Sequence, residues 1–256
     1  MKKITSWRLL PEFPHLQTEF ADLNQIFNLQ GETITSERLS DLIRIKIADD
    51  FYYVKRYRVA GKGLRRFLGK SRIRSEWENL LWFAEQDIST APVIAYGLET
   101  RWGLFHRGAM VTKGIPNSED LASLARANDP RLNDAVWVKN ISLQAAQMLQ
   151  KMHQKGFVHN DFKWRNLLVD DQDRLYVIDC PLGAFWRGAL LRYRCIKDLV
   201  MLDRVAKYKL TRSQRMRFYL QYRGHQRLTG EDKRQLQQLL SRKERRACSF
   251  APKLAV

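Results

Sequence analysis

The segment Gly156–Pro181, GFVHNDFKWRNLLVDDQDRLYVIDCP, gathers the side chains of this sequence that are best suited to chemistry. Two apolar triplets separated by an acidic turn predict a small β-hairpin within it. That hairpin would return Asp179 to the loop that carries Asp161 and Asn166. Two carboxylates and an amide oxygen suit Mg²⁺, because this ion is usually held by few protein oxygens together with substrate phosphates. The segment therefore predicts a site for magnesium and a nucleotide.

Elements upstream of this segment must position further charged groups. The alternation of isoleucine with basic residues over 43–47 is typical of a half-buried strand, and FYYVKRY, residues 51–57, is the expected returning strand. Lys55 lies inside this second strand. A helix over residues 71–86 has an apolar stripe at helical spacing. Glu76 falls at the edge of that stripe, so we expect it to face the interior.

The chain changes character near Pro116. Short strand patterns such as APVIAYG and GAMVTKGI precede this point, whereas a helix over residues 133–154 and further basic helical segments follow it. The sequence thus predicts an α+β fold of two lobes. Residues 1–114 would form a lobe with a small antiparallel sheet, and residues 115–256 would form a mainly helical lobe.

Composition and charge restrict the class of protein. The chain has 256 residues and is 45% hydrophobic, which is enough for a sizeable core. Its apolar runs are too short for a membrane span, and the N-terminal MKKITSWRLLPEF has no signal-like apolar stretch, so we expect a cytoplasmic protein. Cys180, Cys195 and Cys248 lack paired spacing and are expected to be reduced thiols. The net charge of +18 indicates nucleic acid, an anionic membrane surface or an anionic substrate as partner, although a basic surface kept for solubility would look the same.

The octapeptide HNDFKWRN, residues 159–166, resembles the catalytic loop of protein kinases, His-x-Asp-x-x-x-x-Asn, and the VID that ends at Asp179 matches the metal-binding aspartate of the Asp-Phe-Gly element. The resemblance implies that Asp161 accepts or orients the proton of the attacking hydroxyl. It implies that Lys163 neutralises charge on the transferring phosphoryl group. It also implies that Asn166 and Asp179 hold Mg²⁺.

The upstream residues extend this resemblance. Lys55 resembles the kinase lysine that pairs with the phosphates of the nucleotide, and Glu76 resembles the ion-pair partner of that lysine. Asp198, within IKDLVMLD, resembles the aspartate that hydrogen-bonds the backbone of the catalytic loop, and His159 is expected to brace that loop. Lys55 alone could be an ordinary strand lysine and Asp198 a surface acid. A buried polar network without catalysis, or a pseudokinase, also remains open.

Departures from the kinase pattern concern the acceptor. No glycine lies between Gly31 and Gly61, so the turn that covers the phosphates must be built otherwise, with TITSERLSD, residues 33–41, as a candidate. Pro181 replaces the glycine of Asp-Phe-Gly and disfavours a switch by flipping. The segment between Asp179 and Asp198 is short, and no Ala-Pro-Glu motif appears in it. We therefore expect an acceptor that is not a protein.

The whole sequence resembles the bacterial lipopolysaccharide-core kinases, which phosphorylate heptose or Kdo (3-deoxy-D-manno-octulosonic acid) sugars of the inner core. The resemblance covers residues 42–222 and is carried by YYVKRY, SEWENL, HNDFKWRN, VIDCPLGAFW and RCIKDLVMLDRVAKY. It implies a protein-kinase-like fold, ATP as donor, and peripheral attachment at the cytoplasmic face of the inner membrane. The basic run Lys62–Arg74 would meet Kdo carboxylates and lipid phosphates.

Alternative functions are a kinase of the same fold acting on another small molecule, an atypical Ser/Thr protein kinase, or a non-catalytic basic protein that binds membrane or nucleic acid. Arginines mixed with aromatic residues, as in WRGALLRYRCIK, could stack on bases. No DNA- or RNA-binding motif is visible, so no specific nucleic acid partner is expected. The oligomeric state is left open by the sequence.

Overall fold

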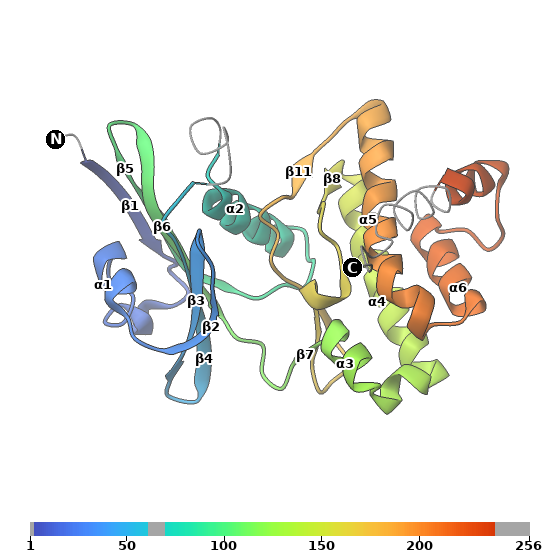
Figure 1. Cartoon of the computed structure of the whole chain (residues 1–256), viewed down its shortest axis with the longest axis horizontal. Coiled ribbons are helices and arrows are strands. Elements are labelled where there is room, and N and C mark those ends of the chain that lie inside the picture. The colour runs from blue at the N-terminus through green and yellow to red at the C-terminus, as the bar shows by residue number, and fades with distance from the viewer. Residues whose placement is uncertain (1–2, 61–69, 239–256) are drawn as a thin grey trace, which may run out of the picture. The chain divides into compact units, whose positions relative to one another are not determined.

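A computed structural model describes residues 3–60 and 70–238 (Figure 1). The chain divides into two compact units, of which the first comprises Met1–Ser118 together with Tyr176–Leu182 and the second comprises Glu119–Leu175 together with Gly183–Val256. The predicted lobe boundary lies between residues 114 and 115, whereas the first unit continues to Ser118 and takes up a later segment. Residues 62–69 of the predicted basic run Lys62–Arg74 lie outside the described residues.

The first unit is built on a six-stranded antiparallel sheet of order β1-β5-β6-β4-β3-β2. The strands are β1 (Lys3–Leu9), β2 (Glu32–Ser36), β3 (Ser40–Ile47), β4 (Asp50–Tyr57), β5 (Val93–Arg101) and β6 (Leu104–Lys113). The predicted strands over 43–47 and 51–57 are confirmed as β3 and β4. β1 was not predicted, because its residues are mostly exposed and its pairing with β5 joins segments about 90 positions apart.

Alternate residues of the sheet face different partners. Val54 on β4 packs into a core cluster with Phe20, which precedes the short helix α1 (Leu23–Asn28), and with Ile26 of α1. Lys55, its neighbour along the strand, therefore points to the opposite face. Helix α2 (Arg72–Glu85) contacts β5 and β6 and confirms the predicted helix. This alternation directs Lys55 towards α2.

The second unit is mainly helical. Its helices are α3 (Leu121–Ala127), α4 (Ala135–Gln154), α5 (Gly188–Lys209) and α6 (Arg212–Arg223), with 3₁₀ turns at Pro130–Asn133 and Trp164–Asn166. Its short strands are β7 (Glu119–Asp120), β8 (Phe157–Val158), β9 (Leu167–Val169) and β11 (Ala184–Phe185), and β10 (Leu175–Val177) is next to β9 in a small sheet. The two triplets of the predicted hairpin are thus confirmed as β9 and β10. The α+β class is confirmed as well.

Local sequence explains where α4 and α6 begin and end. The carboxylate of Asp134 accepts hydrogen bonds from the amides of Val136 and Trp137, which starts α4. Gly156, at a φ of +77°, follows the end of α4, a backbone conformation that glycine adopts without strain. Thr211 forms a capping box at the start of α6, and Gly224 ends that helix. In the described part of the chain, no helix combines the length and the apolar character needed to cross a bilayer.

Candidate phosphotransfer site

Three charged side chains of the first unit, Lys55, Glu76 and Asp179, form one cluster with Lys55 at its centre. Its Nζ donates hydrogen bonds to Oε1 of Glu76 and to Oδ1 of Asp179, each at 2.7 Å. The hydroxyl of Tyr57 donates to the second oxygen of Glu76 at 3.2 Å. Glu76 is 2% exposed because it follows the apolar stripe of α2, as the helical spacing predicts. Strand β4, helix α2 and the segment after β10 thus contribute one charged residue each.

The electrostatics of this cluster follow from one ammonium group that faces two carboxylates. Burial raises the pKa of Glu76 to about 7, with Asp179 adding to the shift and Lys55 opposing it. Burial alone would lower the pKa of Lys55, but the charges of Glu76 and Asp179 outweigh it and raise the pKa of Lys55 above its ordinary value. Lys55 therefore stays protonated. Fully ionised, the three groups carry an excess negative charge that favours binding of a cation.

The segment that holds Asp179 is fixed to neighbouring elements of the first unit. Asp179 has a φ of +59°, a left-handed conformation that aspartate tolerates better than most residues. The hydroxyl of Thr90 donates to the carbonyl of Val177 at 2.7 Å, and Nδ2 of Asn79 on α2 donates to the carbonyl of Cys180 at 2.7 Å. Together with the fixed φ of Pro181, these bonds restrain the segment on both sides of Asp179.

The second unit holds the other predicted residues in one loop. Nζ of Lys163 donates to Oδ2 of Asp161 at 2.6 Å. Nδ2 of Asn166 donates to the backbone carbonyl of Asp161 at 2.9 Å and to its carboxylate at 3.3 Å. These bonds orient the Asp161 carboxylate and turn the amide nitrogen of Asn166 inward, so the amide oxygen points away from Asp161. Amide and carboxylate oxygens are hard ligands, so the donor chemistry of Asn166 and that of Asp179, each taken by itself, fits Mg²⁺.

The backbone of this loop is braced by α5. Asp198 is fully buried, and its Oδ2 accepts a hydrogen bond from the backbone amide of His159 at 2.9 Å. This bond confirms the predicted contact and contradicts the alternative of a surface acid. Asn160 adopts a φ of +64°, and its side-chain oxygen accepts a bond from Arg194 of α5 at 3.1 Å. Two side chains of α5 therefore position the residues that precede Asp161.

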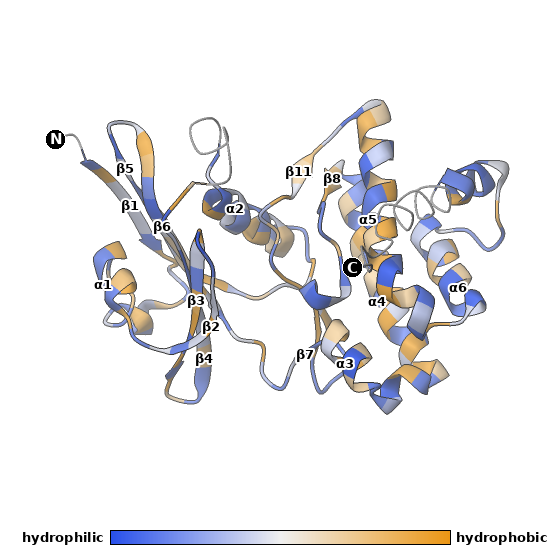
Figure 2. Cartoon of the chain, viewed as in Figure 1, coloured by the Kyte–Doolittle hydropathy of each residue, from blue (hydrophilic) through white to orange (hydrophobic). Residues whose placement is uncertain are grey.

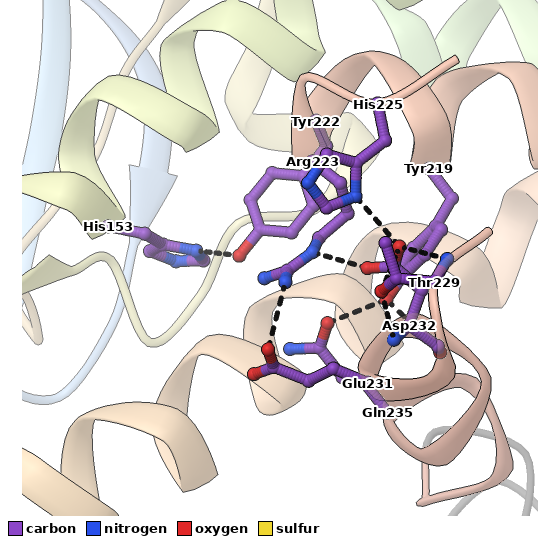
Figure 3. Close-up of polar contacts among 9 residues, drawn as sticks. All are labelled: His153, Tyr219, Tyr222, Arg223, His225, Thr229, Glu231, Asp232 and Gln235. Carbon is purple, nitrogen blue, oxygen red and sulfur yellow. Dashed lines mark hydrogen bonds and ion pairs between the residues drawn. The ribbon is translucent and has the colours of Figure 1, made fainter. Parts of the chain in front are cut away.

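A buried hydrogen-bonded chain continues from this brace into α6. The Nε2 of His153 lies 3.4 Å from Oδ2 of Asp198. Its Nδ1 lies 2.8 Å from the hydroxyl of Tyr222 (Figure 3). A carboxylate only accepts, so Nε2 carries a proton, and Nδ1 of the neutral ring accepts from Tyr222. Burial raises the pKa of Tyr222 well above its usual range, which keeps the phenol protonated as a donor.

A second polar cluster joins α6 to the turn that follows it. Asp232 is fully buried and accepts hydrogen bonds from Nε of Arg223 at 2.6 Å and from the Thr229 backbone amide at 2.9 Å (Figure 3). His225 lies 2.7 Å from the same carboxylate. Despite burial, hydrogen bonds to Thr229, His225 and Arg223 lower the pKa of Asp232 far below its usual range. The carboxylate stays ionised and anchors the C-terminal part of the described chain.

The structure brings the predicted site residues together in two groups. Lys55, Glu76 and Asp179 are in mutual contact in the first unit, and the loop over residues 159–166 is in the second. The expected convergence of Asp179 with the loop residues stays a prediction. Residues 33–41 form the β2–β3 hairpin, closed by a bond from the amide of Glu37 to the carbonyl of Ser40 at 2.9 Å. A phosphate-covering role for this hairpin also stays a prediction.

Three residues that position the loop over residues 159–166 were not predicted from the sequence. They are His153, Arg194 and Tyr222. His153 lies eight residues before Asp161, on the last turn of α4, and its polarity on an otherwise apolar face was an available signal. Arg194 and Tyr222 carry no such signal. Their partners lie 34 and 69 positions away in the chain, and only the packing of α5 and α6 makes those contacts.

The fold and these clusters define the class of protein. The chain superposes on a solved structure described as WaaP in complex with acyl carrier protein, with a TM-score of 0.75 and 25% identity over 96% of this chain and 100% of that one. The fold is therefore that of the protein-kinase-like enzymes. The sequence profile of the Lipopolysaccharide kinase (Kdo/WaaP) family matches residues 33–222, and the chain belongs to this family.

Curated relatives match shorter stretches. A 3-deoxy-D-manno-octulosonic acid kinase of Vibrio parahaemolyticus serotype O3:K6 is 27% identical over 111 residues, which is 43% of this chain and 43% of that protein. A protein of the same name from Vibrio vulnificus strain YJ016 is 32% identical over 88 residues, or 34% of each chain. The matched part thus spans less than half the length of these relatives.

Proposed function

We propose that this protein transfers the γ-phosphoryl group of ATP to a sugar hydroxyl of the lipopolysaccharide inner core, on heptose or Kdo. The observation that carries the proposal is the ion-paired Lys55–Glu76–Asp179 cluster in a chain of the Kdo/WaaP family. The relatives named above are Kdo kinases, so a Kdo-bearing lipid precursor is the first acceptor to test. The acceptor oxygen bonds to the γ-phosphorus as the bond to the bridging oxygen breaks, and ADP leaves.

The first unit would bind the donor. Lys55, kept protonated and aimed by Glu76, would contact the nucleotide phosphates. Asp179 would bind Mg²⁺ together with Asn166 of the second unit, and the metal when bound would neutralise phosphate charge. Because Lys55 donates to both carboxylates, Glu76 would keep the ammonium group in place while Asp179 helped to hold the metal.

The loop of the second unit would act on the acceptor. Asp161 would orient the acceptor hydroxyl and take its proton as the oxygen attacks. Lys163, 2.6 Å from Asp161, would move to the transferring phosphoryl group and offset its charge. The bond from His159 to Asp198 would hold the loop in place during this step. Positioning and charge neutralisation together account for most of the catalysis of phosphoryl transfer.

The same proposal places the protein at the cytoplasmic face of the inner membrane as a peripheral protein, because its acceptor would be an anionic glycolipid. A net charge of +18 supports attraction to such a lipid and to an anionic membrane surface.

Phosphate transfer from labelled ATP tests the proposal directly. Purified full-length protein is incubated with Mg-ATP and with core lipid that bears Kdo, core lipid that bears heptose, or casein as a protein acceptor. Asp161→Ala and Asp179→Ala are compared with Asp171→Ala, which removes an exposed carboxylate from the β9–β10 turn. We expect label on lipid with wild type and Asp171→Ala, and a loss of at least about a hundredfold in the other two.

Each other outcome has a definite meaning. Label on casein but not on lipid would favour an atypical protein kinase over the proposed function. Binding of Mg-ATP without transfer to any acceptor would support the assignment of the donor-binding residues and contradict the proposed acceptor. Absence of Mg-ATP binding in the folded protein would make the chain a pseudokinase or a basic binding protein.

A further inference from the structure

Helix α5 is apolar on two sides. Its inner side buries Cys195, Ile196, Leu199, Val200, Leu202 and Ala206 in the core of the second unit. Apolar and polar residues nevertheless alternate along the whole ribbon of this helix (Figure 2). A helix packed on one side normally presents polar residues on the other, so the second apolar side calls for an explanation.

The outward side of α5 forms one continuous stripe. At 100° per residue, positions separated by three, seven, eleven, fourteen and eighteen residues fall within about 80° of one another. The residues at these positions, here called the outer face of α5, are Leu190, Tyr193, Lys197, Met201, Arg204 and Tyr208. The stripe runs for about 27 Å along the helix axis. Leu190 is 58% exposed, Tyr193 49% and Tyr208 76%, so large apolar groups lie in solvent along its length.

The charge of the outer face is purely positive. Lys197 and Arg204 contribute cations, and no acidic residue lies on the stripe. The two acids of α5 are engaged elsewhere, since Asp198 is buried against the catalytic loop and Asp203 forms an ion pair with Arg215 at 2.6 Å. An aromatic and aliphatic stripe whose charged residues are all cations is typical of helices that lie in the plane of a membrane interface.

We propose that the outer face of α5 lies on the surface of an anionic lipid bilayer. Leu190, Met201 and the two tyrosines would enter the headgroup region, where amphipathic aromatic rings are favoured. Lys197 and Arg204 would extend their charged ends to lipid phosphates while their methylene stems stay in apolar surroundings. A second copy of this chain fits the surface poorly, because pairing two such faces would oppose cations to cations.

This placement links the membrane to the site, and in that respect it deepens the proposed function. The same helix carries the buried Asp198, which accepts the hydrogen bond from His159, and the half-buried Arg194, which donates to Asn160. One rigid helix would therefore contact lipid and brace the catalytic loop. An acceptor embedded in the same bilayer would be presented to a loop at a set distance from the lipid surface.

Vesicle flotation of the full-length protein tests the surface without nucleotide or acceptor, so its outcome does not depend on the proposed function. Vesicles of phosphatidylcholine are compared with vesicles that also contain phosphatidylglycerol. The charge variant combines Lys197→Gln with Arg204→Gln, and the apolar variant combines Leu190→Ser with Tyr208→Ser. All four positions are solvent-facing or half-buried, and a thermal melt checks that each variant is folded.

Matched controls lie on other elements of the second unit. Lys139→Gln combined with Lys233→Gln removes two exposed cations, and Val136→Ser removes a side chain that is 77% exposed on α4. We expect wild type to bind the anionic vesicles. Loss of two interfacial cations should weaken that binding about thirtyfold, which corresponds to about 2 kcal/mol. The apolar variant should lose about tenfold or more, and the controls should stay within about twofold of wild type.

Two results would overturn the proposal. One is anionic-vesicle binding by both outer-face variants that equals wild type, since the contact would then lie elsewhere. The other is an equal loss in the charge variant and in its lysine control, since binding would then reflect net charge without a defined surface.

Discussion

Removing one hydroxyl from α6 tests whether that helix positions the loop over residues 159–166, which we propose is catalytic. Tyr222→Phe keeps a ring that is 6% exposed and deletes the donor that lies 2.8 Å from Nδ1 of His153. A buried acceptor left without a donor costs about 1–3 kcal/mol, so the free energy of unfolding should fall by that amount. Nδ1 then has no hydrogen-bond donor, and the ring keeps only the contact of Nε2 with Asp198 at 3.4 Å. Movement of the ring would displace the Asp198 carboxylate and loosen the bond that the His159 amide donates to it.

Three measurements test this effect, at the His153 ring, at the His159 amide and in the turnover number. The ¹⁵N shifts of the His153 ring report whether Nδ1 accepts a hydrogen bond, and we expect that signature in wild type and its loss in the variant. Hydrogen exchange at the His159 amide should accelerate about tenfold if the bond weakens by about 1.4 kcal/mol. The turnover number should fall by a similar factor while KM for ATP stays unchanged, because Lys55 and Glu76 are untouched.

Tyr219→Phe is the matched control. Tyr219 lies on the same helix, is 4% exposed and donates to Oε1 of Gln235 at 2.6 Å. Its loss should lower stability by a similar amount, yet leave the hydrogen bonding of the His153 ring and the His159 amide as in wild type. If both tyrosine variants changed exchange at His159 equally, the loop would respond to general destabilisation, and the reasoning from the His153 contact would be refuted.

Three further predictions concern buried carboxylates. The pKa of Glu76 in the folded protein is raised to about 7, so its protonated carboxyl group contributes to the free energy of unfolding below pH 4.5, and this contribution is lost as the pH rises through 7. Between these pH values the free energy of unfolding of wild type should fall by up to about 3 kcal/mol relative to that of Glu76→Gln, as measured by denaturant unfolding. Glu99 is fully buried among basic side chains, and despite burial their hydrogen bonds lower its pKa to about 2, so Glu99→Gln should cost about 1–3 kcal/mol at pH 7 and almost nothing at pH 2; an unchanged gap at pH 2 would contradict this. Asp198→Ala should lower turnover at least about tenfold and speed exchange at His159, and a variant with normal exchange would rule out the brace.

The amino-acid sequence determined the features that depend on local spacing. The loop over residues 159–166, the hairpin after it and the inward orientation of Glu76 follow from residues that are close in the chain and share one helical or strand period. The kinase resemblance rests on the same local patterns. Local composition also predicted that Lys55 lies within a strand, because FYYVKRY is rich in β-forming residues.

Tertiary structure alone decided the contacts between residues that are far apart in the chain, because no periodic pattern in the sequence predicts them. Tyr222 reaches His153 across 69 positions, and Arg194 reaches Asn160 across 34, because α4, α5 and α6 pack together and hydrogen-bonding groups in that packing must find partners. The two sides of α5 make the same point. Apolar residues recur on both, so periodicity alone does not say which side is buried, and only packing against the rest of the second unit leaves Leu190 and Tyr208 in solvent.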